Sequence, residues 1–157
     1  MWPRVGSRRS DEHPHLTSST VYTPRVTPPA DSTPHRGRCQ CGALRFEARA
    51  TPKFVANCHC SSCRRATGAA FSTWVGFRDD EVTWQGTPST YASSEGVQRG
   101  WCSNCGTPMS YRGTKWPGET HFLIGVFEEP AAFRPTGAVF TDEALEWAHA
   151  SGPTRAD

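Results

Sequence analysis

The chain has 157 residues and a formal net charge of +2, with seven cysteines, thirteen prolines and fourteen glycines. This length fits about one domain, and the turn-forming composition favours a β-rich, loop-rich fold over a helical bundle. The longest good apolar run, HFLIGVF at residues 121–127, is too short to cross a membrane, and the first twenty residues lack the apolar core of a secretory signal, so we expect a cytoplasmic protein.

Residues 1–36 are rich in Pro, Ser, Thr and Arg and show no apolar periodicity, which predicts a disordered tail. The tail carries five arginines against three acidic residues, so its net charge is +2 and the rest of the chain balances at zero. A neutral body argues against a dedicated nucleic-acid-binding protein, which needs a basic face. We place the domain proper at residues 37–150 and a flexible C-terminus at 151–157.

Segments with strand-like sequence begin after residue 37 and are separated by turn signals such as RDD, QGTP and SSEG. In ALRFEA, residues 43–48, Leu44, Phe46 and Ala48 fall on one side of a strand, and Arg45 and Glu47 fall on the other. Further strands are predicted at residues 70–77, 81–85, 97–101, 109–112 and 121–127. These segments indicate a mainly β fold of small antiparallel sheets.

A short C-terminal helix is expected to end the domain. Thr141 is a suitable N-cap residue, and Asp142 and Glu143 suit the positive first turn of a helix. Ala144 and Leu145 follow as apolar helical positions.

The cysteines fall into three groups, RCQCG, CHCSSC and CSNCG. Disulfides are rare in a reducing cytosol and an odd number leaves one thiol over, so metal ligation is the better interpretation. Cys102 and Cys105, followed by glycine, have the spacing of a zinc knuckle, and Cys39 and Cys41 would complete a closed four-cysteine site. The alternatives are a thioredoxin-like redox pair in the knuckle, which the strand-like flanking sequence disfavours, and an unliganded Cys39 and Cys41.

Three cysteines remain, Cys58, Cys60 and Cys63. Structural zinc is normally enclosed by four protein ligands, whereas three ligands and an open position are typical of zinc that meets a substrate. His59 could instead close the site, but in an extended CHC segment its side chain would point away from its neighbours. His121 and His149 could also approach in space.

Arginines near these cysteines are candidate substrate contacts. A thiolate-rich open zinc suits a thiol, and Arg64 and Arg65 could hold the carboxylate of such a thiol. Arg99 and Arg112 flank the knuckle formed by Cys102 and Cys105 and could reach the same carboxylate. For all four arginines, a solvated surface role is the competing interpretation.

Four motifs together carry a family resemblance: RCQCGALRFEA, NCHCSSCRRATGAAF, YASSEGVQRGWCSNCGTPMSYR and IGVFEEPAAFRP. They closely resemble the glutathione-dependent formaldehyde-activating enzyme (GFA) family, whose zinc domain is also found in centromere protein V. The resemblance runs from about Arg38 to Pro135 and includes all seven cysteines.

The resemblance implies an Mss4-like fold, a carbon-sulfur lyase activity and two zinc ions. The activity is the reversible addition of glutathione to formaldehyde, which gives S-hydroxymethylglutathione. The second zinc would bind glutathione on Cys58, Cys60 and Cys63, and the structural zinc would lie on Cys39, Cys41, Cys102 and Cys105.

Two other functions stay open from the sequence. Formaldehyde also adds to thiols without a catalyst, so the chain could be a glutathione carrier. The basic tail could also belong to a zinc-stabilised module that contacts a nucleic acid or a partner protein.

Overall fold

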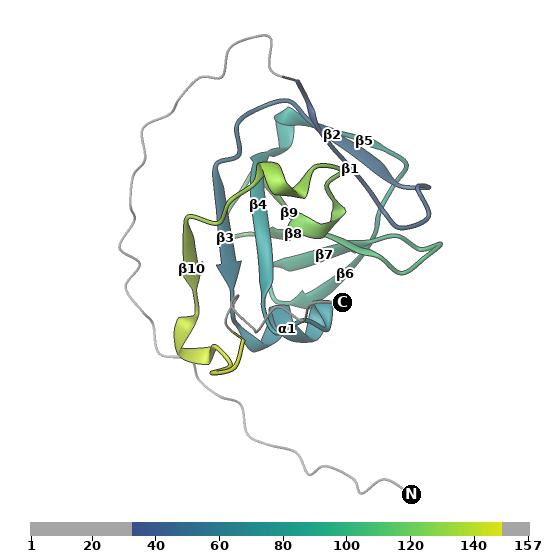
Figure 1. Cartoon of the computed structure of the whole chain (residues 1–157). Helices are drawn as coiled ribbons and strands as arrows, with labels where there is room; N and C mark the ends of the chain where they lie inside the picture. The colour runs from purple at the N-terminus through teal and green to yellow at the C-terminus, as the bar shows by residue number, and fades with distance from the viewer. Residues whose placement is uncertain (1–32, 149–157) are drawn as a thin grey trace, which may run out of the picture.

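The computed structural model describes residues 33–148, in which two β sheets and a single α-helix form (Figure 1). The small sheet is antiparallel, in the order β1 (His35–Arg38), β2 (Arg45–Ala48) and β5 (Val82–Gln85). The large sheet has, in order, β10 (Gly137–Val139), β3 (Phe54–Cys58), β4 (Ser72–Arg78), β9 (Glu119–Leu123), β8 (Pro108–Gly113), β7 (Val97–Trp101) and β6 (Ser89–Ser94).

Helical structure is short and lies between the strands. The α-helix α1 spans Ser61–Thr67 and ends at Gly68, whose φ of 69° closes the helix in the left-handed conformation that glycine tolerates. Four 3-10 turns complete the secondary structure of the described residues: η1 (Asp79–Glu81), η2 (Ile124–Val126), η3 (Pro130–Ala132) and η4 (Thr141–Glu143). Within residues 33–148, no helix is long and apolar enough to span a membrane.

The mainly β prediction is confirmed. The strands expected at 43–48, 70–77, 81–85, 97–101 and 109–112 correspond to β2, β4, β5, β7 and β8. The alternation in β2 is also as expected, because Leu44, Phe46 and Ala48 are buried whereas Arg45 is exposed.

Other features differ from the expectation. β1, β3, β6, β10 and α1 were not expected, and β10 pairs with β3 in parallel although only antiparallel pairs were predicted. The strand expected at 121–127 is β9 only as far as Leu123, after which η2 turns Val126 and Phe127 into the core. A continuous apolar run carries no period that separates a strand from a buried turn. β1 begins at His35, two residues before the expected domain start, and the expectations for residues 1–32 and 149–157 lie outside the described residues.

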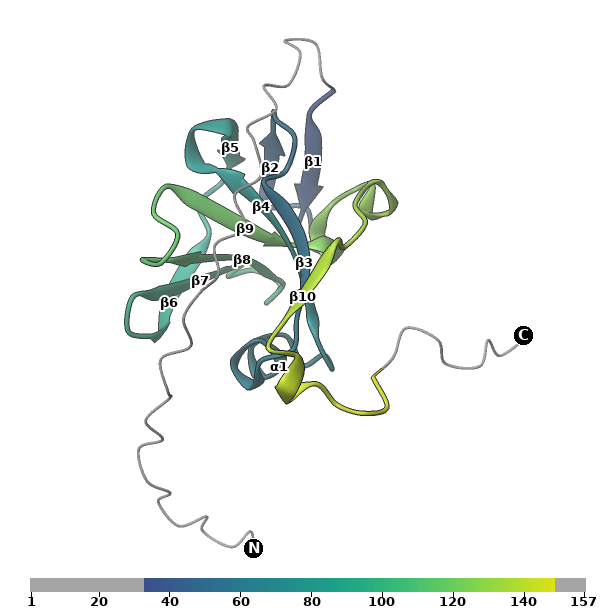
Figure 2. The same ribbon diagram turned by 90° about the vertical axis from the view of Figure 1, so that its left-hand side faces the viewer.

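The C-terminal helix is present only as the single 3-10 turn η4. Thr141 is not its N-cap, which is Phe140, and the backbone returns to an extended conformation at Ala144. Tertiary contacts replace the missing helical hydrogen bonds: the Glu143 carboxylate accepts from the backbone N–H of Ser61 at 2.7 Å, and its carbonyl accepts from Arg64 at 2.6 Å. Both ribbon views show this segment beside α1 (Figures 1 and 2).

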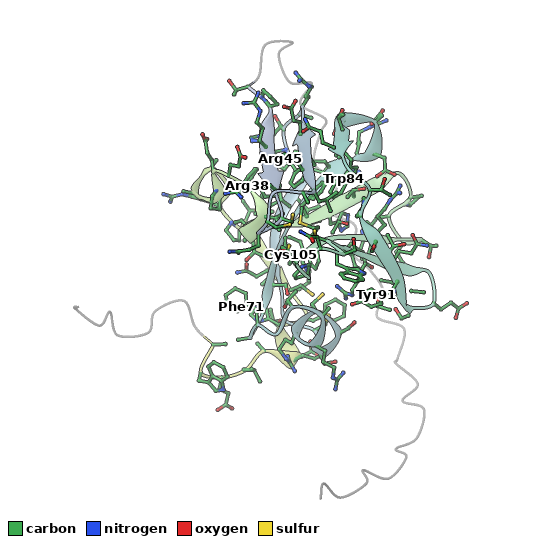
Figure 3. All side chains as sticks on the ribbon, turned by 90° about the vertical axis from the view of Figure 1, so that its right-hand side faces the viewer. Arg38, Arg45, Phe71, Trp84, Tyr91 and Cys105 are labelled. Carbon is green, nitrogen blue, oxygen red and sulfur yellow. The ribbon has the colours of Figure 1, made fainter. Side chains whose placement is uncertain are left out.

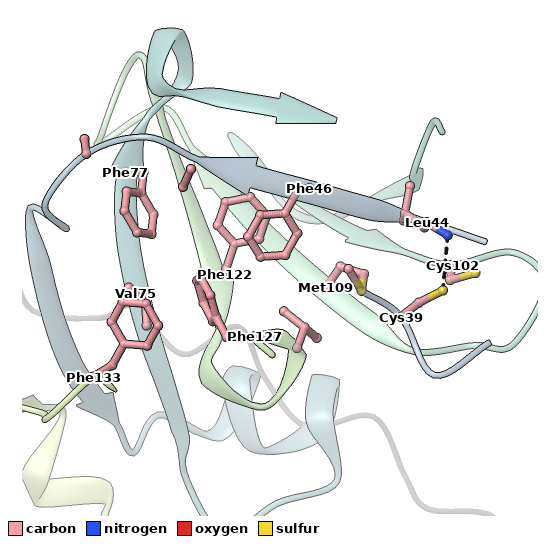
Figure 4. Packing of buried hydrophobic residues seen from close by; sticks show 13 residues of the cluster. Cys39, Leu44, Phe46, Val75, Phe77, Cys102, Met109, Phe122, Phe127 and Phe133 are labelled. Carbon is pink, nitrogen blue, oxygen red and sulfur yellow. Dashed lines mark hydrogen bonds between the residues drawn. The ribbon is translucent and has the colours of Figure 1, made fainter. Parts of the chain in front are cut away.

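The main core lies between the small sheet and one face of the large sheet (Figure 4). At its centre the rings of Phe46 and Phe122 stack with centroids 3.9 Å apart. Gly37 permits this packing, since a Cβ there would lie 2.4 Å from the Phe46 ring. The opposite face of the large sheet carries a second cluster around Cys58, Cys63 and Trp74.

Candidate active site

The four cysteines of the RCQCG and CSNCG motifs form one cluster. The sulfur atoms of Cys39, Cys41, Cys102 and Cys105 all lie within 4.8 Å of one another. Two of these separations are 3.5 Å and 3.9 Å, close to the edge of about 3.8 Å that a tetrahedron with metal-sulfur bonds of about 2.3 Å requires. A disulfide needs about 2.05 Å, so the geometry fits a bound metal ion and not sulfur-sulfur bonds.

Backbone geometry and N–H donors support this cluster. Gly42 and Gly106 follow the two knuckles with φ of 76° and 75°, which lets each loop turn both sulfurs to one side. The Leu44 backbone N–H lies 3.3 Å from Cys39 Sγ, and the Asn104 amide donates to Cys41 Sγ at 3.2 Å. Such donors stabilise negatively charged sulfur, as a metal site requires.

The other three cysteines form the second cluster, with all three sulfurs within 4.8 Å of one another. Local structure explains the arrangement: β3 ends at Cys58, and Cys60 is the N-cap of α1, its sulfur accepting from the Cys63 backbone N–H at 3.4 Å. Cys58 and Cys63 are buried, and Cys60 is half-buried. The cluster therefore offers three sulfurs on one side of a metal ion.

His59 lies outside this cluster. Its ring packs against Phe71 with centroids 5.3 Å apart, and its Nδ1 is buried without a hydrogen-bond partner among the described residues. The backbone N–H of His59 donates to Val139 in β10 at 3.1 Å, which holds this part of the chain extended. The side chain therefore faces away from the two cysteines that flank it.

Arg99, in β7, contacts the three-cysteine cluster. Its Nη2 donates to Cys63 Sγ at 3.6 Å and to Ser62 Oγ at 3.2 Å, and its Nε donates to Ser93 Oγ at 3.2 Å. The side chain is 5% exposed, and no carboxylate of the described residues forms an ion pair with it. A buried cation without a carboxylate is costly unless another anion compensates it, and here that anion is the sulfur cluster.

Two aromatic rings hold the Arg99 guanidinium in place. Its central carbon lies 5.3 Å from the ring centre of Tyr111 and 6.0 Å from that of Trp74. Tyr111 is the cross-strand neighbour of Arg99 and stacks in turn on His121, its neighbour in β9. Sequence reasoning missed the role of Tyr111. A signal for Arg99 was present, because alternation along a strand places Arg99 on the same side as the apolar residues Val97 and Trp101, which indicates a charge that points inward.

Proton sharing in the three-cysteine cluster concentrates negative charge on one sulfur. Hydrogen bonds from Cys58 and Cys60, together with Arg99, lower the pKa of the Cys63 thiol to about 2. The same contacts with Cys60 and Cys63 raise the pKa of the Cys58 thiol well above its usual range. These contacts favour the thiolate form of Cys63, which is the form in which a cysteine sulfur binds a soft metal ion.

The other candidate arginines lie elsewhere. The Arg64 guanidinium is occupied by the carbonyl oxygens of His59 and Glu143, at 2.5 Å and 2.6 Å. Arg64 and Arg65 line a hollow of about 390 Å³ with Leu145 and Trp147, and this hollow does not include Arg99. Arg112 forms an ion pair with Asp79 at the surface.

A cleft of about 440 Å³ lies beside the residues that surround the three-cysteine cluster, although its described lining includes none of the three cysteines. Arg99, which contacts Cys63, and Trp74, which packs with the same cluster, both line the cleft. Ala66 and Thr67 of α1 form another part of the wall. Tyr91 and Gly106 also line the cleft, and Figure 3 labels Tyr91 together with Cys105, the neighbour of Gly106 in the sequence. The lining therefore includes a neighbour of each sulfur cluster: Arg99 contacts Cys63, and Gly106 follows Cys105.

Comparison with known proteins gives three findings. The model of a family described as "Glutathione-dependent formaldehyde-activating enzyme" matches residues 34–143. An "uncharacterized lyase" of Schizosaccharomyces pombe is 29% identical over 93 residues, a match that spans 59% of this chain and 66% of the relative. A solved structure of a Rhodobacter sphaeroides protein superposes with a TM-score of 0.54 at 21% identity, over 66% of this chain and 98% of the other, and shares the fold.

Proposed function

The chain belongs to the glutathione-dependent formaldehyde-activating enzyme family, and on this premise we propose that it is a metal-dependent carbon-sulfur lyase. The reaction is the reversible addition of glutathione, or a related small thiol, to formaldehyde or a similar aldehyde. The name of the Schizosaccharomyces pombe relative, a lyase, agrees with this class of reaction. The observation that carries the proposal is the three-sulfur cluster beside a buried arginine that has no carboxylate partner in the part of the chain that the structure describes.

Two zinc ions are proposed, one for each cysteine cluster. Cys39, Cys41, Cys102 and Cys105 supply the four ligands of a closed structural site, which ties the start of the domain to its far end. Cys58, Cys60 and Cys63 supply three ligands of the second site. Zinc at that site would offer an open position for a thiol and would lower the pKa of that thiol.

The chemical step needs no redox partner. A sulfur-carbon bond forms as the carbonyl π bond of the aldehyde breaks, and the carbonyl oxygen takes up the proton that the thiol releases. In the lyase direction the hydroxyl loses its proton and the sulfur-carbon bond breaks. Negative charge therefore develops on one oxygen, and a fixed hydrogen-bond donor beside the sulfur would stabilise it.

Arg99 is the proposed donor. Its Nη1 has no hydrogen-bond partner among the described residues, and the side chain lines the neighbouring cleft. An oxygen two bonds from the substrate sulfur would lie near the guanidinium that already contacts Cys63. A guanidinium keeps its protons, so Arg99 stabilises the oxygen and the proton itself comes through solvent. For contact with the substrate we propose Arg99 ahead of Arg64 and Arg65, which line the other hollow.

The test is the visible spectrum of the full chain with cobalt in both sites, titrated with reduced glutathione and, as a control, with oxidised glutathione. A spectral change with the reduced form alone, lost in Cys60→Ser but kept in Ser103→Ala near the other cluster, supports thiol binding at the three-cysteine site. No change with any small thiol would contradict the proposal. Cobalt content measured on each sample separates failure to bind thiol from failure to bind metal.

An enzyme would accelerate the exchange of formaldehyde with glutathione, whereas a carrier would only bind glutathione. Exchange of formaldehyde with glutathione, followed by NMR, should be faster with catalytic amounts of protein than without it. Binding with no acceleration would favour the carrier function.

A further inference from the structure

The cleft beside the three-cysteine cluster has an unusual lining for a site that handles small charged molecules. Six of the twelve described lining residues are aromatic or aliphatic, among them Trp74, Tyr91, Trp101 and Leu123, and three others carry hydroxyl groups. Among the described residues, Arg99 is the only charged side chain that lines it, and no acidic side chain does. The wall thus matches a ligand with an apolar body and one negative charge.

Glutathione and formaldehyde match this lining poorly. Formaldehyde has two non-hydrogen atoms and leaves a cleft of about 440 Å³ almost empty. Glutathione carries two carboxylates and an ammonium group at its ends, whereas the cleft offers one cation and no carboxylate for the ammonium group. A buried charge without a partner weakens binding, so the cleft disfavours such a ligand.

The position of Arg99 fixes where the negative charge of a cleft ligand would lie. Its Nη2 contacts Cys63, while its Nη1 has no hydrogen-bond partner within residues 33–148. A carboxylate on one N–H of Nη1 would sit next to the sulfur cluster, leave the second N–H of Nη1 for the developing oxygen, and leave the apolar body along Trp74 and Trp101. Planar guanidinium groups bind carboxylates well, and the apolar contacts add the hydrophobic contribution.

We propose that the cleft binds an aromatic or branched apolar carboxylate, as the specificity pocket for the thiol or aldehyde substrate. This inference rests on the proposed lyase function, since it takes the three-cysteine site as the reaction centre. The substrate class is then a small apolar acid that carries the thiol or the aldehyde group, in place of the peptide thiol glutathione.

The first experiment measures binding without chemistry. Full-length protein with both metal sites filled is titrated in a calorimeter with 3-phenylpropanoate, which has the apolar body and the carboxylate but no thiol. We expect saturable binding at least tenfold tighter than that of acetate or of the uncharged 3-phenylpropan-1-ol. No saturable binding of 3-phenylpropanoate, or equal binding of all three probes, overturns the proposal.

Three substitutions locate the bound probe. Ala66→Phe places a ring into the cleft from α1 and should weaken 3-phenylpropanoate binding at least tenfold, whereas Ala70→Phe, which lies on the other hollow, should leave binding unchanged. Arg99→Gln should remove the preference for the acid over the alcohol even if Ala66→Phe proves unstable. Equal effects of Ala66→Phe and Ala70→Phe would place the probe outside the cleft.

A second titration separates this inference from the proposed function. The cobalt spectrum is recorded with glutathione and with 2-sulfanyl-3-phenylpropanoate, and turnover is compared for formaldehyde and phenylacetaldehyde. If glutathione changes the spectrum while 3-phenylpropanoate fails to bind, the lyase proposal stands and the cleft inference fails. If 3-phenylpropanoate binds in the cleft while no thiol changes the spectrum, the cleft is a carboxylate site and the lyase proposal fails. Preference for the phenyl thiol or for the phenyl aldehyde tells which substrate carries the apolar group.

Discussion

Replacing Arg99 with glutamine tests the most connected side chain of the candidate site. The substitution removes a cation that contacts the buried Cys63 sulfur and two aromatic rings, while solvent can replace the hydrogen bonds to the more accessible Ser62 and Ser93. A charged hydrogen bond contributes about 1.5–3 kcal/mol and a cation–π contact about 0.5–1 kcal/mol. We therefore expect Arg99→Gln to lower the free energy of unfolding by about 2.5–5 kcal/mol.

Activity should fall more than this loss of stability explains. Removing one donor from a developing oxyanion typically costs about 100-fold in rate. Formaldehyde exchange measured by NMR at saturating metal, with metal content checked, should show a decrease of about that size in kcat/KM. Urea unfolding followed by tryptophan fluorescence gives the stability of the same samples.

Arg112→Gln is the matched control. Arg112 is also in a strand of the large sheet, but it is exposed and pairs with Asp79, so its loss should cost less than about 1 kcal/mol and leave turnover unchanged. The reasoning is refuted if the two variants behave alike, or if Arg99→Gln changes turnover less than threefold while remaining folded.

Three further outcomes are expected. Gly76→Ala should destabilise the fold by about 1–3 kcal/mol in urea unfolding, because its Cβ would lie 2.2 Å from the Phe54 ring, while Gly125→Ala, which meets nothing within 4 Å, should cost far less. Burial lowers the pKa of His121 below its usual 6.5, so the unfolded chain binds the proton more readily; stability should fall as pH drops through about 6.5, and His121→Gln should flatten that slope in thermal unfolding. Cys102→Ser should reduce metal content by one ion per chain and strongly lower the unfolding temperature, and an unchanged temperature would mean that the four-cysteine cluster has no structural role.

Much of the metal-site geometry could be predicted from spacing. Cysteines two or three residues apart lie within the reach of one short turn, so Cys102 with Cys105, and Cys60 with Cys63, come together by local backbone geometry alone. The grouping of Cys39 and Cys41 with the second knuckle followed from counting ligands, and the structure brings these four sulfurs within 4.8 Å. The spacing of the cysteines and the number of metal ligands can both be read directly from a sequence.

The helices show where local signals fail. The acidic residues at 142 and 143 resemble a helix start, yet Glu143 uses its carboxylate and its carbonyl to hold α1, and the helix stops after one turn. α1 itself has seven residues and buries only Cys63, too little apolar periodicity to be recognised. Hydrogen bonds between Glu143 and α1, about eighty residues apart in sequence, join the two segments, and helix propensity is a weak guide where such tertiary contacts form.

The sequence by itself determined the mainly β class, the faces of β2 and the division of the cysteines into four and three. Each of these follows from a short period or a short spacing. The tertiary structure alone decided which arginine meets the sulfur cluster and what surrounds it. Arg64 is one residue from Cys63 in sequence but points to backbone carbonyls, whereas Arg99, thirty-six residues away, reaches Cys63. The physical reason is that strand register and sheet face, set by packing across the whole domain, fix where a long side chain ends.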